Sequence, residues 1–191
     1  MRLPEAQIAG FGAVLAAASI FVFVAVREPA RAQPVARGYS FAGGTARERA
    51  TVRAALAASS FDWGRVPGHV TIHLVPGGSC FATPGQIWLG RRVLAHGRGA
   101  WGLIQHEYGH EVDYLLLDVR ARASLDRLLG GKTWWPNGRW RHNQYGAERF
   151  ASTLAWSYWP SPHNTLVRYA WPEATAMRPA AFRRLMNRLL R

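Results

Sequence analysis

The sequence is poor in cysteine, in acidic residues and in lysine. A single cysteine, Cys80, excludes an internal disulfide framework and a zinc site built from four cysteines; we expect it to be a small buried residue. Eleven acidic residues stand against 24 basic ones, of which only Lys132 is a lysine, and the formal net charge is +13. The arginines are scattered in runs no longer than a pair. We therefore expect a solvated basic surface and no specific nucleic-acid site.

Nothing in the composition indicates disorder or an internal repeat. An apolar content of 49% with nine tryptophans is too high for a mostly disordered chain, and 191 residues suffice for one domain with its own core. A long uncharged run extends from Ile8 to Val26 and is long enough to cross a bilayer. It predicts one N-terminal transmembrane helix or a signal segment, with Ala30-Arg31-Ala32 as a cleavage candidate.

The apolar segment also bears on where the domain works. The arginines on its two sides do not settle its orientation, and the positive-inside rule favours a cytoplasmic domain only weakly. An N-terminal apolar segment that precedes a single domain more often exports that domain. We therefore expect an exported, extracytoplasmic domain that is membrane-anchored or secreted. It would be a monomer that contacts the membrane only through an uncleaved segment.

Changes in composition divide the chain into three parts. Residues 1–27 hold the signal or anchor segment, and residues 28–44 read as a linker rich in proline, arginine, glycine and alanine. Residues 45–191 carry the alternation and periodicity of a folded domain.

Hydrophobic periodicity predicts an α+β domain in which a small mixed sheet packs on helices. Thr45 and Glu48 form a capping-box pattern, which opens a helix that runs to about Ser60. Strands are expected at 70–75 and 87–89, a basic aromatic loop at 132–143, and further helices at 98–117, 119–129, 144–159 and after Pro179.

The segment His106-Glu107-Tyr108-Gly109-His110 is an H-E-x-x-H motif. On a helix, residues four apart lie on nearly the same face, about 6 Å apart along the axis, so His106 and His110 can bind one Zn²⁺. Glu107 lies about 100° round the helix and can take a proton from a water activated at the metal. The motif therefore predicts two metal ligands and a general base.

The residues around the motif strengthen this interpretation. Apolar side chains flank it on both sides, from Ala100 to Leu117, which is typical of a buried helix. Burying two histidines and several carboxylates is costly unless they have partners. A metal ion supplies that partner, whereas a chance match of the motif leaves the buried groups unexplained.

A catalytic zinc usually has a third protein ligand, and Glu148 is the best candidate. It is a lone acid between small and aromatic residues on an expected helix. The alternative is an ion pair with Arg149 or Arg141. Competing ligands, all in expected loops, are His142, His163 and Glu173.

Asp113 follows the motif on the same helix. It lies about 10.5 Å along the axis from His106, which is too far for one ion. We expect it to be a structural hydrogen-bond partner, or to fix the tautomer of a ligand histidine.

The runs His-Glu-Tyr-Gly-His-Glu-Val-Asp and Ala-Glu-Arg-Phe-Ala resemble the gluzincin class of zinc metallopeptidases, and within it the anthrax lethal factor-like and Pro-Pro endopeptidase group. The resemblance covers about residues 86–159 and implies a zincin-like fold with one Zn²⁺ per chain. It implies His106, His110 and Glu148 as metal ligands and Glu107 as the base.

The same family has a tyrosine about two turns before the ligand glutamate, where it stabilises the oxyanion. Arg141 stands at that position here. Tyr145 or His142 could replace the tyrosine as a catalytic donor, and Arg141 itself is a third candidate.

The function expected from these features is zinc-dependent hydrolysis of peptide bonds, with a protein or peptide as substrate. The substrate would lie extended along an edge strand at 86–89. Trp134, Trp135 and Trp140 could form a shelf for it, although core packing is the commoner role of tryptophan. Two alternatives remain open: an inactive binding module on the same zinc fold, and a basic envelope or polyanion-binding protein.

Overall fold

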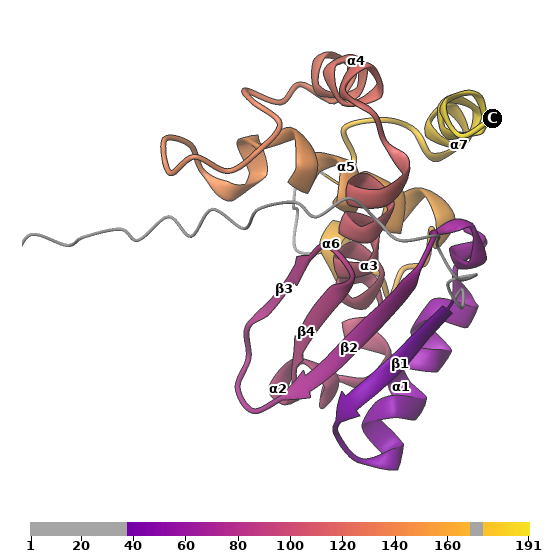
Figure 1. Cartoon of the computed structure of the whole chain (residues 1–191), viewed down its shortest axis with the longest axis vertical. Helices are drawn as coiled ribbons and strands as arrows, with labels where there is room; N and C mark the ends of the chain where they lie inside the picture. Colours follow the sequence, from indigo (N-terminus) through magenta and orange to yellow (C-terminus); the bar gives the residue numbers. More distant parts are fainter. Residues whose placement is uncertain (1–37, 169–173) are drawn as a thin grey trace, which may run out of the picture. The chain divides into compact units, whose positions relative to one another are not determined.

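A four-stranded mixed sheet lies beside helices α1 and α3 in the computed structural model, which describes residues 38–168 and 174–191 (Figure 1). These residues belong to one compact unit. The strands are β1 (Gly38–Gly43), β2 (His69–Val75), β3 (Cys80–Thr83) and β4 (Gln86–Gly90), in the order β1-β2-β4-β3. The predictions for residues 1–27, for residues 28–37 and for Glu173 lie outside the described residues.

The alternation of buried side chains explains how the sheet packs. In β2, Val70, Ile72 and Leu74 are buried, whereas His69 and His73 lie on the opposite face. The buried face joins one hydrophobic cluster with side chains of α1 and α3. The sheet therefore presents one apolar face to the helices, as the strand pattern predicts.

Two features of the sheet differ from the sequence prediction. Residues 38–43, expected to be linker, form β1, which pairs in parallel with β2. The predicted edge strand at 86–89 is internal, because β4 pairs with β2 on one side and with β3 on the other. The edge strand beside it is β3, which the sequence did not predict because it has only four residues and no clear alternation.

The helices agree closely with the predicted ones. The capping box at Thr45 and Glu48 is present and opens α1 (Ala46–Ala58), and Gly130 ends α4 in the left-handed conformation. The other helices are α2 (Arg91–Leu94), α3 (Trp101–Leu116), α4 (Val119–Leu129), α5 (Gly146–Tyr158), α6 (Thr165–Arg168) and α7 (Pro179–Leu189), with 3₁₀ turns η1 (Trp63–Arg65), η2 (Gly97–Ala100) and η3 (His142–Gln144).

Helices α3 and α5 pack closely against each other. A Cβ atom built at Gly109 of α3 would lie 3.2 Å from the Cα atom of Ala151 in α5. Because glycine has no Cβ, the two backbones can approach to this distance. Within residues 38–168 and 174–191, no helix is both long and apolar enough to span a membrane.

Candidate metal centre

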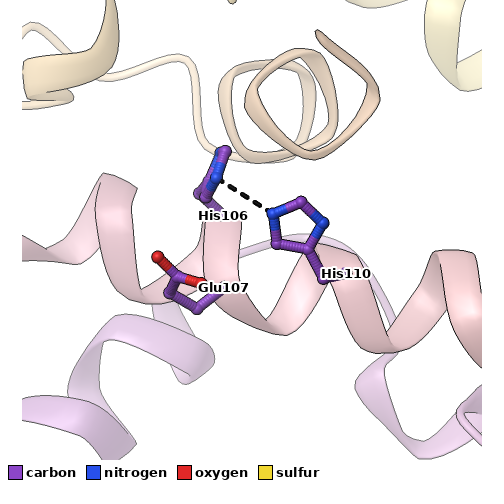
Figure 2. A group of neighbouring side chains, drawn as sticks. All are labelled: His106, Glu107 and His110. Atoms are coloured by element: carbon purple, nitrogen blue, oxygen red, sulfur yellow. Dashed lines mark hydrogen bonds between the residues drawn. The ribbon is translucent and has the colours of Figure 1, made fainter. Parts of the chain in front are cut away.

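The middle of α3 carries the H-E-x-x-H motif in a buried position. Every residue from Gln105 to Asp113 is buried. His106, Glu107 and His110 each offer a ligand atom, and these atoms lie within 4.8 Å of one another. Figure 2 shows the two imidazole rings on one side of α3, joined by the contact between their nitrogens. These three residues form a buried cluster that could bind a metal ion.

Glu148 reaches the same point from α5. Its Oε2 atom lies 3.2 Å from Nε2 of His106 and 3.3 Å from Nε2 of His110, and the two nitrogens are 3.2 Å apart. Ligands at 2.0–2.1 Å from a tetrahedral zinc ion would be about 3.3–3.4 Å apart. The three atoms therefore have the mutual spacing that one small metal ion requires.

The arrangement is difficult to explain without a cation. Glu148 is 8% exposed, and nitrogens of His106, His110 and His142 lie 3.0–3.3 Å from its buried Oε2 atom, none of them in hydrogen-bond geometry in the described part of the chain. Two nitrogens and one carboxylate oxygen converge there, and none of them brings a donor unless it binds a proton. Buried polar atoms in this state cost free energy, which a bound cation would offset.

A hydroxyl from α5 orients one of the two rings. Nδ1 of His106 lies 2.9 Å from Oγ of Ser152, and a proton on Nδ1 leaves the lone pair of Nε2 pointing at the centre. Nδ1 of His110 has no hydrogen-bond partner among the described residues. Ser152 can therefore fix the tautomer of His106, the role that the sequence analysis suggested for Asp113.

The ionisation of the ligands also suits a metal. Burial lowers the pKa of His106 to about 4, so this imidazole is neutral at pH 7. Burial alone would raise the pKa of Glu148, but its contacts with three imidazoles hold it well below the usual range. Burial opposes protonation of His110, yet the contact with Glu148 raises its pKa. A metal ion would compete with a proton for the nitrogen of His110.

A cavity of about 190 Å³ opens beside the centre. His106, Glu107, His110 and Glu148 contribute to its wall. Its other lining residues come from the edge strand, the end of α3, the loop before η3 and the start of α5: Cys80, Phe81, Ala82, Tyr114, Trp135, Pro136, His142 and Ala147. The candidate metal-binding residues therefore face a space that can admit part of another molecule.

Glu107 faces this cavity with a free carboxylate. The residue is 4% exposed and makes no hydrogen bond in the described residues. Burial raises its pKa to about 7, although the nearby imidazoles of His110 and His142 act to lower this pKa. A buried carboxylate beside the ligands and without a partner is available to accept a proton from a molecule in the cavity.

The structure separates the candidates for the oxyanion donor. His142 lines the cavity, and its Nε2 atom lies 3.0 Å from Oε2 of Glu148. Tyr145 is not among the residues that line this cavity, and its buried hydroxyl accepts from the amide of Trp140 and donates to Oδ1 of Asn137. Arg141 also lies outside the cavity lining and is the N-cap residue of η3.

The remaining predicted residues have other surroundings. Asp113 accepts from Nε of Arg122 at 2.7 Å and from Nε1 of Trp134 at 2.9 Å, so it has a structural role and does not contact a ligand histidine. His163 is exposed in a turn away from the centre. Arg149 donates to backbone carbonyls of Leu129 and Asn143, so it is not the ion-pair partner of Glu148.

The three tryptophans divide between the two predicted roles. Trp134 is 8% exposed and belongs to the core. Trp135 is 40% exposed and lines the cavity, where its ring stacks on Tyr114 with an interplanar angle of 11°. Trp140 is 44% exposed but does not line the cavity. Only Trp135 can therefore serve as part of a substrate shelf at this cavity.

Sequence reasoning missed Tyr114. This residue follows His106 by eight positions, which places it on the motif's side of α3, two turns further along. Its hydroxyl lies 3.3 Å from the carbonyl oxygen of Ala82 in β3, and burial raises its pKa to about 12. The spacing of eight residues from His106 on one helix is the sequence signal that points to Tyr114.

Cys80 is half-buried rather than buried and also lines the cavity. Burial raises its pKa to about 11, so it is a neutral thiol at pH 7. It therefore contributes a small apolar surface to the wall.

Comparisons of the chain with family models, with curated proteins and with solved structures found no match. The site's own geometry therefore carries the functional argument.

Proposed function

We propose that the protein is a zinc-dependent peptidase in which His106, His110 and Glu148 bind the metal and Glu107 acts as the general base. One observation carries the proposal. The three ligand atoms form a triangle with edges of 3.2, 3.2 and 3.3 Å, beside a cavity that a buried, unpartnered carboxylate faces.

The donor set favours zinc. Two imidazole nitrogens and one carboxylate oxygen are typical of catalytic zinc sites, which keep a position open for substrate or water. When bound, Zn²⁺ would supply a Lewis acid that polarises a carbonyl group and lowers the pKa of water at the site.

The chain's own groups would perform the proton transfers. Glu107 would remove a proton from the attacking water and pass it to the leaving amine. Tyr114 would donate a hydrogen bond to the oxygen of the attacked carbonyl, because this residue lines the cavity and its pKa of about 12 keeps the hydroxyl protonated. Its present contact with Ala82, at 3.3 Å, is long for a hydroxyl hydrogen bond, so the group can be recruited.

The substrate class follows from the edge of the sheet. Cys80, Phe81 and Ala82 of the edge strand β3 line the cavity. An extended peptide could pair with this edge and bring a peptide bond to the centre. This replaces the strand at 86–89 as the docking edge. The apolar run from Ile8 to Val26 supports an exported site of action, anchored or released.

The test compares metal content and hydrolysis in the full chain. Wild-type protein, Glu107→Gln, Glu148→Ala and the control His163→Ala are purified and analysed for bound metal by mass spectrometry. A fluorescently quenched, unfolded casein serves as the substrate. We expect about one zinc per chain in wild type, Glu107→Gln and His163→Ala, with hydrolysis reduced about 10²- to 10⁴-fold by Glu107→Gln and zinc much weakened by Glu148→Ala.

The other outcomes point elsewhere. Zinc at one per chain with no chelator-sensitive hydrolysis in wild type would favour the inactive binding module. An absence of metal, together with salt-dependent binding to polyanions, would favour the basic polyanion-binding protein. Full hydrolysis in Glu107→Gln would remove the general base from the mechanism.

A further inference from the structure

The eight residues from Trp135 to His142 form a loop in which every residue is exposed. Both ends of this cavity loop nevertheless reach the cavity. Trp135 and Pro136 line it at the start, and His142 lines it at the end. Loops with few buried contacts open easily. Specific contacts are therefore needed to keep both ends of this exposed loop at the cavity.

Backbone hydrogen bonds close the base of the cavity loop. The amide of Lys132 donates to the carbonyl of Gln144 at 2.8 Å, and the amide of Gly146 donates to the carbonyl of Thr133 at 2.8 Å. Thr133 and Tyr145 also form an isolated parallel bridge. These contacts tie the base of the loop to the start of α5, the helix that carries Glu148.

Tyr145 ties down the outer part of the same loop. Its side chain is 4% exposed, and its hydroxyl accepts from the amide of Trp140 at 3.1 Å. The hydroxyl also lies 3.4 Å from Oδ1 of Asn137. Tyr145 directly precedes α5, three residues before Glu148. Tyr145, which holds the loop, is therefore the N-cap of the helix whose first turn carries the proposed metal ligand Glu148.

His142, at the end of the cavity loop, contacts the proposed metal ligand Glu148. Its Nε2 atom lies 3.0 Å from Oε2 of Glu148, which is the normal length of an N–H···O hydrogen bond. The ring centroids of His142 and His106 are 6.3 Å apart, whereas those of the two proposed ligand histidines are 4.8 Å apart. Nε2 of His142 thus lies within ion-pair distance of the proposed ligand oxygen, where a proton on this nitrogen can be shared with the carboxylate.

We propose that Tyr145 and His142 are positioning residues of the metal centre. Tyr145 holds the cavity loop through Asn137 and Trp140, and the held loop sets His142 so that it fixes the carboxylate of Glu148 in its ligand orientation. The inference rests on the proposed function, since it takes Glu148 to be a metal ligand. Groups that hydrogen-bond a ligand in this way typically contribute 10- to 100-fold to metal affinity.

The experiment measures zinc affinity of the full chain by competition with a chromogenic chelator. We expect His142→Ala to weaken zinc binding about 10- to 100-fold, and His142→Gln, which keeps a donor, to recover part of the loss. Tyr145→Phe should weaken binding in the same direction by up to about tenfold, the value of one hydrogen bond. His163→Ala, an exposed histidine away from the centre, should leave the affinity unchanged.

Thermal unfolding of the metal-free variants separates positioning from folding. Unchanged midpoints together with weakened zinc binding support the inference. Zinc affinity in His142→Ala equal to that of wild type, while Glu148→Ala loses the metal, would overturn the inference and leave the proposed function intact. Zinc affinity unaffected by Glu148→Ala would overturn both, because the ligand that His142 is meant to fix would then not be a ligand.

Discussion

Helix α3 and the cavity loop face the same cavity but are built in opposite ways. In α3, every residue from Gln105 to Asp113 is buried, whereas in the loop from Trp135 to His142 every residue is exposed. The helix supplies the motif histidines and Glu107, and the loop supplies Trp135 and His142 to the cavity wall.

If the site is hydrolytic, as proposed, this difference corresponds to two separate structural requirements. Metal ligands and a base have to be held within about 0.5 Å of their working positions, which favours packed helices. Substrates differ in shape, so the surface that meets them benefits from an element that can adjust. The close contact of α3 with α5 would meet the first requirement. The cavity loop would meet both, because Tyr145 holds its middle while the exposed Trp135 at its start faces the cavity.

The largest expected effect tests whether the chemistry belongs to the helix. Tyr114→Phe should reduce kcat about 10²- to 10³-fold, the loss usual for one oxyanion donor, and leave zinc affinity unchanged. Steady-state kinetics with the quenched casein checks this, with Tyr158→Phe as a control whose hydroxyl lies outside the cavity lining. An unchanged kcat would indicate that Tyr114 does not donate to the carbonyl oxygen and that a residue of the cavity loop, such as His142, does so instead.

The next prediction concerns the point where helix and loop are joined. Asp113 is fully buried and binds Arg122 of α4 and Trp134, the residue before the cavity loop. Asp113→Ala should lower the free energy of unfolding by about 3 kcal/mol, because it leaves a partly buried arginine without its partner. Urea denaturation measures the loss. Asp113→Asn keeps an acceptor for Trp134, so its free energy of unfolding should fall less than that of Asp113→Ala. An equal fall in the two variants would show that the contact with Trp134 does not stabilise the protein.

A smaller effect is expected from the helix contact itself. Gly109→Val places a side chain where Ala151 already lies at 3.2 Å, and should lower the free energy of unfolding by about 1–3 kcal/mol through overpacking. Zinc affinity should fall with it, since α3 and α5 carry different ligands. Gly78→Val is the control, because a Cβ atom there meets only Arg92 at 3.9 Å. Equal stability of the two variants would contradict the tight approach of the helices.

The smallest effect lies on the surface, away from both regions. The backbone amide of Thr45 and the guanidinium of Arg91 hold the pKa of Glu48 at about 2, below its ordinary 4.5. A lowered folded-state pKa stabilises the protein fully above pH 4.5, and the contribution is lost as the pH falls toward 2. Glu48→Gln should therefore lower Tm slightly at pH 7 and progressively less between pH 4.5 and 2. A deficit independent of pH and salt would contradict the electrostatic origin.

The sequence predicted the parts of the fold that local rules control. The capping box at Thr45 and the glycine at Gly130 set helix ends through hydrogen bonds within a few residues. Four-residue spacing placed His106 and His110 on one face of a helix, because helix geometry alone requires it. The choice of Glu148 also followed from a local signal, a lone acid in a buried helix.

The differences between the sequence prediction and the structure involve contacts that the sequence does not show. Strand β1 has the composition of a linker and is ordered through its pairing with β2, about 30 residues further along. The strand at 86–89 looked like an edge because the short β3 gave no signal of its own. Tyr145 was close to Glu148 in sequence, but its hydroxyl is bound to the cavity loop.

By itself, the sequence determined the existence of a buried helix with two histidines and a carboxylate at metal-binding spacing, because that spacing depends only on the helical repeat. The tertiary structure alone decided that Glu148 meets both histidines, that Glu107 and Tyr114 face one cavity and that His142 contacts the same oxygen of Glu148. The physical reason is that these relations depend on how closely α3 and α5 pack and on where the cavity loop is pinned, and both are set by contacts between parts of the chain far apart in sequence.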